Sequence, residues 1–116
     1  FAVSLHERLS ARSSGVKALA CTPGVCATDM FVHVQQLSRP GAPPDLSRVA
    51  SVEDGACAQL KCACDPAVRS GELWGPRGMG GPPVRISIAP PTVLTDEQSK
   101  ATLWECCERA VGPFEL

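Results

Sequence analysis

The sequence predicts an α/β fold built around a parallel sheet. At the N-terminus, Phe1, Leu5 and Leu9 recur every four residues with polar residues between them, which is the apolar period of an amphipathic helix. Gly15 follows at a place where helices commonly end in a left-handed residue. The short apolar run 16–22 then suits a strand buried on both faces, because such strands do not alternate in polarity. A helix, a glycine turn and a buried strand make up half of a strand–helix–strand unit.

A second helix is predicted to begin after Ser51. This residue stands as an N-cap, and the two acidic residues of the first turn suit the positive end of the helix dipole. The helix should end at Asp65, since Pro66 cannot continue it. Its expected inward face consists of Ala56, Leu60 and Cys64.

The last part of the chain predicts two strands and a third helix. Residues 71–74 suit a short strand, and residues 84–88 alternate between apolar and polar side chains, as in a strand with one wet face. Thr95 and Gln98 have the spacing of a capping box, and Gly112 marks the end of the helix. The expected apolar stripe of this helix consists of Leu103, Trp104, Cys107 and Val111.

Residues 29–50 show no clear period in their polarity. The prolines within 39–44 cannot be held in a helix, so most of this stretch is predicted to be a loop. A loop of this length inside a compact domain is more often functional or mobile than idle. The stretch is therefore a candidate for a binding segment.

Composition limits the classes of protein to which the chain can belong. Its 116 residues are about the size of one domain, and a net charge of -1 gives no general attraction to nucleic acid. Its apolar runs fall short of the roughly 20 residues that a membrane-spanning helix needs. The seven cysteines are an odd number, and no signal-peptide pattern precedes them. These features predict an intracellular protein, cytoplasmic or in an organelle lumen, with reduced thiols.

The residues at 22–30, Thr-Pro-Gly-Val-Cys-Ala-Thr-Asp-Met, resemble a motif of the short-chain dehydrogenases/reductases. In that family a strand ends in Pro-Gly, and a Thr or Ser follows four residues after the Gly. The order downstream is similar as well, with a long loop, a helix opening at 51, and Ser-Gly-Glu-Leu-Trp-Gly-Pro at 70–76, as in retinol-dehydrogenase-like and protochlorophyllide-reductase-like members. The resemblance implies that 1–116 is the C-terminal portion of one domain, part of an incomplete, Rossmann-type, doubly wound parallel sheet. Residues 28–50 would form its substrate-loop region and 95–112 its C-terminal helix.

The same resemblance implies a cofactor site for NAD or NADP. Gly24 would let the backbone approach the cofactor, and backbone groups of Val25 and Cys26 would hydrogen-bond the nicotinamide carboxamide. The hydroxyl of Thr28 would face the carboxamide or the pyrophosphate. The implied cofactor-binding residues are Pro23, Gly24, Val25, Cys26 and Thr28, and the implied substrate-loop residues are Met30, Phe31 and His33. The substrate would be a small alcohol or carbonyl compound, and the resemblance allows for a homo-oligomer. On the local motif alone, a plain Pro-Gly turn followed by a helix-capping Thr28 explains these residues equally well.

The chain lacks the residues that transfer the proton in this family. It contains no tyrosine, so the family's Tyr-x-x-x-Lys pair is absent and no catalytic residue is assigned. No Gly-rich dinucleotide fingerprint opens a strand–helix turn, and the glycines of 75–81 lie late and amid prolines. Because no N-cap precedes Phe1, the chain is expected to be cut at its left edge, and this portion alone is expected to be inactive. The alternative is a non-catalytic truncated protein that binds partners through an exposed sheet edge.

Two other classes of site have weaker support. Cys62, Cys64, Cys106 and Cys107 could be drawn as a metal site, but structural zinc sites need longer gaps within each pair, so no metal is predicted. The cysteines are expected to be buried as small apolar residues. A serine hydrolase is disfavoured because no Gly-x-Ser-x-Gly elbow is present, and His6 is expected to lie on a helix surface.

Overall fold

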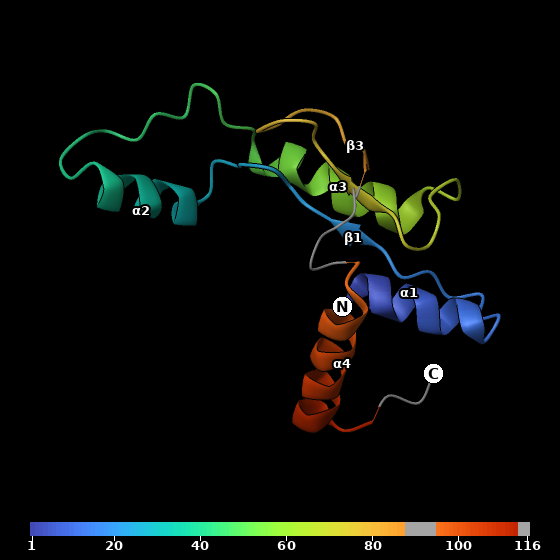
Figure 1. Ribbon diagram of the computed structural model, residues 1–116. Coiled ribbons are helices and arrows are strands. Elements are labelled where there is room, and N and C mark those ends of the chain that lie inside the picture. Colours follow the sequence, from blue (N-terminus) through green and yellow to red (C-terminus); the bar gives the residue numbers. More distant parts are fainter. Residues whose placement is uncertain (88–94, 114–116) are drawn as a thin grey trace. The chain divides into compact units, whose positions relative to one another are not determined.

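The computed structural model describes residues 1–87 and 95–113 (Figure 1). Its elements in chain order are α1 (Ala2–Ala11), β1 (Ala20–Cys21), α2 (Asp29–Ser38), α3 (Val52–Cys64), β2 (Leu73–Gly75), β3 (Val84–Ile86) and α4 (Glu97–Val111). The predicted combination of helices with a sheet is confirmed. None of the helices in these two ranges is both long and apolar enough to cross a membrane.

The three strands form one mixed sheet in the order β1–β2–β3. The Ala20 N–H donates to the Glu72 carbonyl at 3.1 Å and the Thr22 N–H to the Trp74 carbonyl at 2.9 Å, so β1 and β2 advance in the same direction. The predicted parallel pairing is present. The prediction of a strand over 16–22 buried on both faces is wrong: β1 has two residues and forms an edge of the sheet, and Val16 is 64% exposed.

The chain divides into two compact units. Unit 1 comprises Phe1–Ala20, Ala67–Leu73 and the described part of 87–116, and unit 2 comprises Cys21–Pro66 and Trp74–Ile86. The buried apolar side chains of unit 1 are those of Leu9, Ala18, Val68 and Trp104. The described residues of unit 2 that are buried are smaller: Gly55, Ala58, Gly75 and Pro76. In unit 1 the Trp104 ring stacks on the Phe1 ring with centroids 5.3 Å apart, and the Arg8 guanidinium lies 4.1 Å from the Trp104 ring centroid. Unit 1 therefore has the more developed core.

Helix α1 ends in a Schellman motif. The Ser14 N–H donates to the Leu9 carbonyl and the Ser13 N–H to the Ser10 carbonyl, which satisfies two carbonyls of the last turn. Ser13 is the left-handed residue, with a φ of 52°, and Gly15 has no positive φ. The prediction that Gly15 fills this position is therefore wrong, because the helix ends two residues earlier than the glycine suggests.

Helix α2 occupies the start of the stretch that was predicted to be a loop. Thr28 is its N-cap and accepts a hydrogen bond from the Phe31 N–H at 3.4 Å, with Asp29 in the first turn. The prolines of 39–44 stand beyond the end of α2, so they limit the helix without preventing it. The loop prediction is wrong for Asp29–Ser38.

Helix α3 begins and ends where the sequence predicts, with Ser51 accepting a hydrogen bond from the Asp54 N–H at 3.0 Å. Its inward face is different from the expected one. Gly55 and Ala58 are buried, whereas Ala56, Leu60 and Cys64 are exposed. A Cβ added at Gly55 would overlap the sulfur of Cys26, so α3 packs closely against the segment after β1. The close approach requires small residues, and the larger apolar side chains turn outward.

The later strands agree with the sequence patterns in part, because β2 spans Leu73–Gly75 where a strand over 71–74 was predicted. In β3, Arg85 is exposed and its two neighbours are half-buried, as the alternation predicts; Ile88 lies outside the described residues. The prediction for the start of α4 is partly wrong, because Asp96 is the N-cap and accepts from the Ser99 N–H at 2.7 Å. The end of α4 is as predicted, with Gly112 at a φ of 92°.

The buried face of α4 differs from the predicted stripe. Trp104 is buried as expected, but Leu103 and Val111 are exposed. Lys100 is buried instead, one turn before Trp104 on the same side of the helix. Helix α4 contacts α1 through this side.

Candidate functional site

The segment 23–28, called the 23–28 turn below, contains most of the sequence-predicted site. Gly24 has a φ of 75°, in the left-handed region that side chains rarely adopt. A Cβ on Gly24 would lie 2.6 Å from the Met79 carbonyl oxygen and 2.6 Å from Pro76 Cγ. The glycine is therefore required at this position, and the backbone that approaches it closely belongs to the chain itself.

Backbone hydrogen bonds join the 23–28 turn to two other segments of unit 2. The Val25 N–H donates to the Met79 carbonyl at 2.6 Å, and the Val25 carbonyl accepts from the Ala50 N–H at 3.2 Å. The Ala27 N–H then donates to the Ala50 carbonyl at 2.9 Å, and Cys26 forms a parallel bridge with Ala50. Both backbone groups of Val25, a residue expected to contact the nicotinamide, are therefore engaged within the protein.

The glycine-rich segment 75–81 has a structural role that sequence reasoning missed. Gly80 lies so close to Ala50 that an added Cβ would stand 3.0 Å from the Ala50 Cβ. Segment 75–81 therefore packs against Gly24 of the 23–28 turn and against Ala50, which is hydrogen-bonded to that turn. A cluster of glycines is a signal for such close backbone packing, independent of any nucleotide fingerprint.

The 23–28 turn and the first turns of α2 line an open hollow of about 340 Å³. It is lined by Pro23, Gly24, Val25, Cys26, Thr28, Met30, Phe31 and Val34. All five predicted cofactor residues are among them, as are two of the three predicted substrate-loop residues. His33 is exposed and is not among them, whereas Val34 was not predicted. The missed helix explains both differences, because the 3.6-residue period of α2 brings Val34 to the side of Met30 and turns His33 away.

The polar groups of the hollow are few and uncharged. Thr28 Oγ1 accepts from the Phe31 N–H and can still donate its own hydrogen. The Cys26 thiol lies 3.5 Å from the Pro23 carbonyl oxygen, to which it donates. The other lining side chains are apolar. Such a surface can bind and orient a flat, weakly polar group, but the lining residues include no carboxylate, imidazole or amine for proton transfer.

The cysteines do not behave as the sequence predicts. Each of the seven cysteines is exposed or half-exposed, so the prediction that they are buried apolar residues is wrong. Within 1–87 and 95–113, no three His, Cys, Asp or Glu side chains gather closely enough to hold a metal ion. The Cys106 sulfur accepts a hydrogen bond from Arg109 on the next turn of α4.

His6 has partners that its expected place on a helix surface did not suggest. Its Nδ1 lies 2.9 Å from the hydroxyl of Ser70, which also accepts from the Ala18 N–H at 2.9 Å. The imidazole covers Gly71, where an added Cβ would stand 2.6 Å from His6 Cδ2. Within unit 1, His6 therefore links α1 to Ser70 and Gly71, the segment before β2, through a hydrogen bond and a packing contact.

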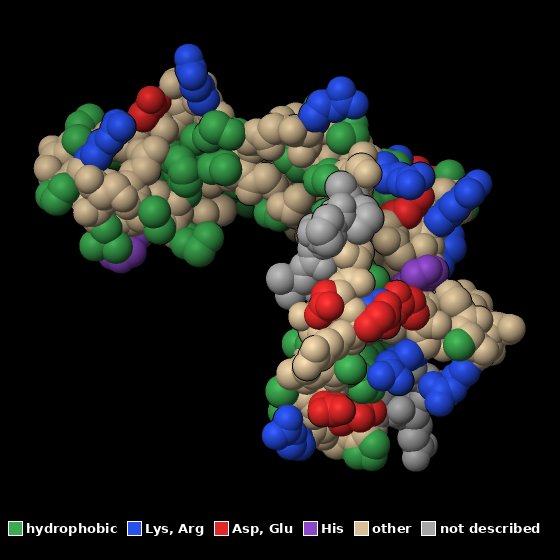
Figure 2. All heavy atoms as spheres, in the orientation of Figure 1, with side chains coloured by type: hydrophobic (Ala, Val, Ile, Leu, Met, Phe, Trp, Pro, Cys, Tyr) green, Lys and Arg blue, Asp and Glu red, His purple; other side chains and the backbone are tan. Residues whose placement is uncertain are grey.

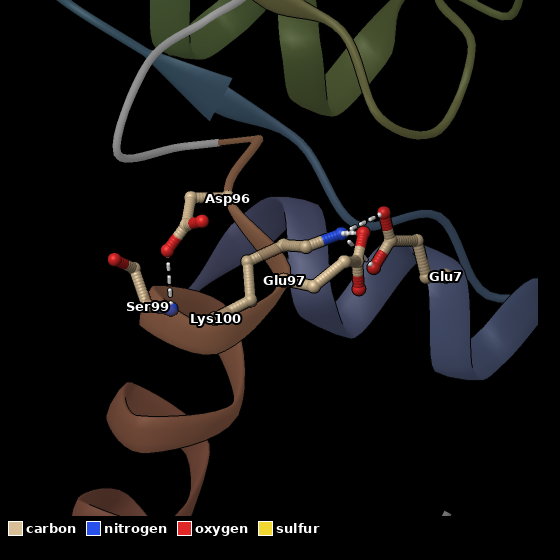
Figure 3. Close-up of polar contacts among 5 residues, drawn as sticks. All are labelled: Glu7, Asp96, Glu97, Ser99 and Lys100. Atoms are coloured by element: carbon tan, nitrogen blue, oxygen red, sulfur yellow. Dashed lines mark hydrogen bonds and ion pairs between the residues drawn. The ribbon is translucent and has the colours of Figure 1, made fainter.

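A polar cluster joins α1 to α4 in the same unit. Figure 3 shows the Lys100 ammonium between two carboxylates, at 2.6 Å from Glu7 Oε1 and 2.7 Å from Glu97 Oε1. Hydrogen bonds to Glu7 and then to Glu97 raise the pKa of Lys100 above its usual value. Hydrogen bonds from Ser99 lower the pKa of the N-cap Asp96. A lysine held as a cation in this way has a structural role, because it is not available as a proton acceptor near neutral pH.

No protein-family model, no curated protein and no solved structure matches this chain. The arguments for function therefore rest on the geometry of the hollow and on the sequence motif at 22–30.

Proposed function

We propose that the chain is part of an NAD(P)-dependent oxidoreductase that transfers hydride between the nicotinamide and an alcohol or carbonyl substrate. In this proposal its sheet belongs to a Rossmann-type parallel sheet, and the 23–28 turn borders the nicotinamide. The observation that carries the proposal is the hollow, which gathers the five residues implied by the family motif together with Met30 and Phe31. The residues that the family motif implies for cofactor binding thus line one hollow.

The residues of the hollow fit the nicotinamide portion of the cofactor in part. A volume of about 340 Å³ is at the small end of the range of ligand pockets, which suits one ring and its neighbour better than a whole dinucleotide. The apolar side chains of the hollow would cover one side of the ring. Since both backbone groups of Val25 already bond within the protein, recognition of the carboxamide would depend mainly on the Thr28 hydroxyl. The bound cofactor supplies the hydride chemistry, and these residues bind and orient it.

The proposal is tested with the neutral probe 1-methyl-1,4-dihydronicotinamide, titrated into the ¹⁵N-labelled 116-residue chain. We expect the amide signals of Gly24, Val25, Cys26 and Thr28 to shift and to saturate. An adenosine titration serves as the control and should leave these signals in place. Absence of any saturable shift in the 23–28 turn at millimolar probe would contradict the proposal.

Variants of Thr28 separate a ligand contact from a helix cap. Thr28→Ser keeps both the cap and the hydroxyl hydrogen, so probe affinity should stay near that of the wild type. Thr28→Asp keeps the cap but has no hydrogen to donate, and we expect affinity to fall by about fivefold to tenfold, the usual worth of one hydrogen bond. Equal affinity in the two variants would show that Thr28 only caps α2.

A non-catalytic interaction module is the second candidate function. It is favoured by the edge position of β1 and by the exposed apolar side chains of α2. The probe titration distinguishes the two, because an interaction module without a nicotinamide site would give no saturable shift in the hollow.

A further inference from the structure

A second hollow, called the Ser4 hollow below, lies within unit 1 between α1 and the first turns of α4. Its volume is about 150 Å³, and it is lined by Ser4, Glu7, Arg8, Glu97, Lys100 and Ala101. Pockets for drug-sized ligands begin at about 300 Å³, so the Ser4 hollow fits a molecule of only a few non-hydrogen atoms. Four of its six side chains are charged, so a ligand for this hollow must itself be polar.

The Ser4 hydroxyl is buried at this hollow. Ser4 is 5% exposed, and its Oγ has no hydrogen-bond partner among the described residues. Nearly all buried polar groups in folded proteins are hydrogen-bonded, because an unpaired one loses its contacts with water and gains none in return. Since Ser4 lines the hollow, a polar molecule bound there can supply that partner.

The Arg8 guanidinium has hydrogen-bond donors that the protein does not use. Its central carbon lies over the Trp104 ring, 4.1 Å from the ring centroid, and this contact does not consume its N–H groups. Within the described part of the chain, the guanidinium forms no ion pair and no hydrogen bond. A planar guanidinium in this state is suited to bind a carboxylate through two parallel hydrogen bonds.

The two carboxylates of the hollow are held by Lys100. Its ammonium bonds to both oxygens of Glu7, at 2.6 and 2.9 Å, and lies 2.7 Å from Glu97 Oε1 (Figure 3). Because this ammonium stands between the carboxylates, a metal cation is disfavoured at the same place. Glu97 Oε2 has no partner among the described residues, and it can still accept a hydrogen bond from a cationic group.

We propose that the Ser4 hollow binds a small zwitterionic α-amino acid of the size of glycine or alanine. The carboxylate of the ligand accepts from the Arg8 guanidinium and the Ser4 hydroxyl, and its ammonium donates to Glu97 Oε2. The two acidic and two basic side chains of the hollow balance each other, which suits a neutral zwitterion better than an anion or a cation. This inference does not depend on the proposed nicotinamide site, which lies in unit 2.

Titration of glycine into the ¹⁵N-labelled 116-residue chain, at constant ionic strength, tests the site. We expect the amide signals of Ser4, Arg8 and Lys100 to shift and to saturate with a Kd in the millimolar range, because so small a ligand makes few contacts. Acetate and methylammonium each carry one of the two charged groups and should bind about tenfold more weakly or less. No saturable shift at about 50 mM glycine, or acetate binding as tightly as glycine, overturns the proposal.

Variants of Arg8 test the carboxylate contact. Arg8→Lys keeps the charge but removes the planar pair of donors, so we expect the Kd for glycine to rise by about tenfold. The matched control is Arg12→Lys at the end of the same helix, since Arg12 is exposed and does not line the hollow. Circular dichroism checks that both variants keep their helices. Unchanged affinity in Arg8→Lys, or equal weakening in the two variants, overturns the proposal.

Ser4→Ala should have opposite effects on stability and on binding. The hydroxyl is unpaired in the free chain and alanine is the better helix former, so we expect the urea midpoint of the free chain to rise. The same change should weaken glycine binding by about fivefold to tenfold, because one hydrogen bond to the ligand is lost. A lower midpoint would show that the hydroxyl already has a partner in the free chain. That result, or unchanged affinity for glycine, overturns the proposal.

Discussion

At the scale of single residues, Gly24 combines two constraints that a side chain cannot satisfy together. Its φ of 75° disfavours any residue with a Cβ, and the space beside it is filled by the Met79 carbonyl and the Pro76 ring. The family resemblance implied that Gly24 lets the backbone approach the cofactor closely. It did not indicate that segment 75–81 of the same chain packs against this glycine.

Gly24→Ala should lower the free energy of unfolding by about 3 kcal/mol, because the backbone strain of a left-handed residue adds to the overlap with Met79. The measurement is urea unfolding with linear extrapolation. Gly41→Ala is the control, since Gly41 has a φ of 81° with no atom within 4 Å of an added Cβ. That variant should lose only the strain, about 1 kcal/mol. Equal losses in the two variants would show that the overlap has no effect.

Thr28 shows why the sequence alone left two interpretations of one residue open. The structure makes it the N-cap of α2, which is the structural interpretation. It also places the residue in the lining of the hollow, where its hydrogen can still be donated. Capping and ligand contact use different parts of the same hydroxyl, so one role does not exclude the other.

At the scale of elements, the end of α1 depends on a serine in an unfavourable conformation. Ser13 is left-handed with a φ of 52°, at the Schellman position that most often holds glycine. Ser13→Gly should therefore raise the free energy of unfolding by about 0.5–1 kcal/mol. Ser14→Gly, one residue further, should instead destabilise the protein, since Ser14 has no positive φ and its hydroxyl accepts from the Val16 N–H. A stabilised Ser14→Gly would contradict this explanation, and urea unfolding of both variants measures the effects.

The sequence predicted a loop where α2 lies, because the prolines that follow the helix were taken to exclude it. Thr28 is an N-cap and Asp29 is an acidic residue of the first turn, and both favour a helix. The prolines of 39–44 favour a loop, but only at their own positions. Prolines stop a helix at their own positions and leave the residues before them free to form one. The apolar residues Met30, Val34 and Leu37 have the spacing of one helix face, and this spacing is the signal that could have identified α2.

At the scale of the whole molecule, contacts distant in sequence hold unit 1 together. Lys100 on α4 bonds to Glu7 on α1, 93 residues apart, and Trp104 stacks on Phe1. Figure 3 shows the ion pair of Lys100 with Glu7 joining α4 to α1. The strength of this ion pair should change with pH.

The stability contributed by Lys100 should be lost at alkaline pH. The Glu7 carboxylate raises the pKa of Lys100 in the folded chain above the unfolded value of 10.5, so the contribution is fully present below about pH 10 and declines as pH rises through the folded pKa. The difference in unfolding free energy between wild type and Lys100→Met should therefore be constant from pH 8 to about pH 10 and shrink above it. The absence of tyrosine removes the phenol that would otherwise titrate in this range.

Lys100→Arg provides the control for this pH dependence. Its guanidinium stays charged throughout the range, so its stability relative to Lys100→Met should remain flat to pH 12. Wild type and Lys100→Met losing stability in parallel above pH 10 would show that the ion pair with Glu7 does not contribute to folding.

The sequence by itself determined that α1, α3 and α4 exist, where α3 begins and ends, where α4 ends, and that the sheet contains a parallel pair. These follow from local signals such as caps, prolines, glycines and apolar periods, which act within a few residues. Burial was decided only by the tertiary structure, because it depends on segments that are distant in sequence. The close packing of Gly55 against Cys26 turned Leu60 outward, and the pairing of Lys100 with Glu7 placed a charged residue inward. The residues around the hollow were predicted from a motif, whereas the wall supplied by Val34 and the contacts of segment 75–81 required the folded chain.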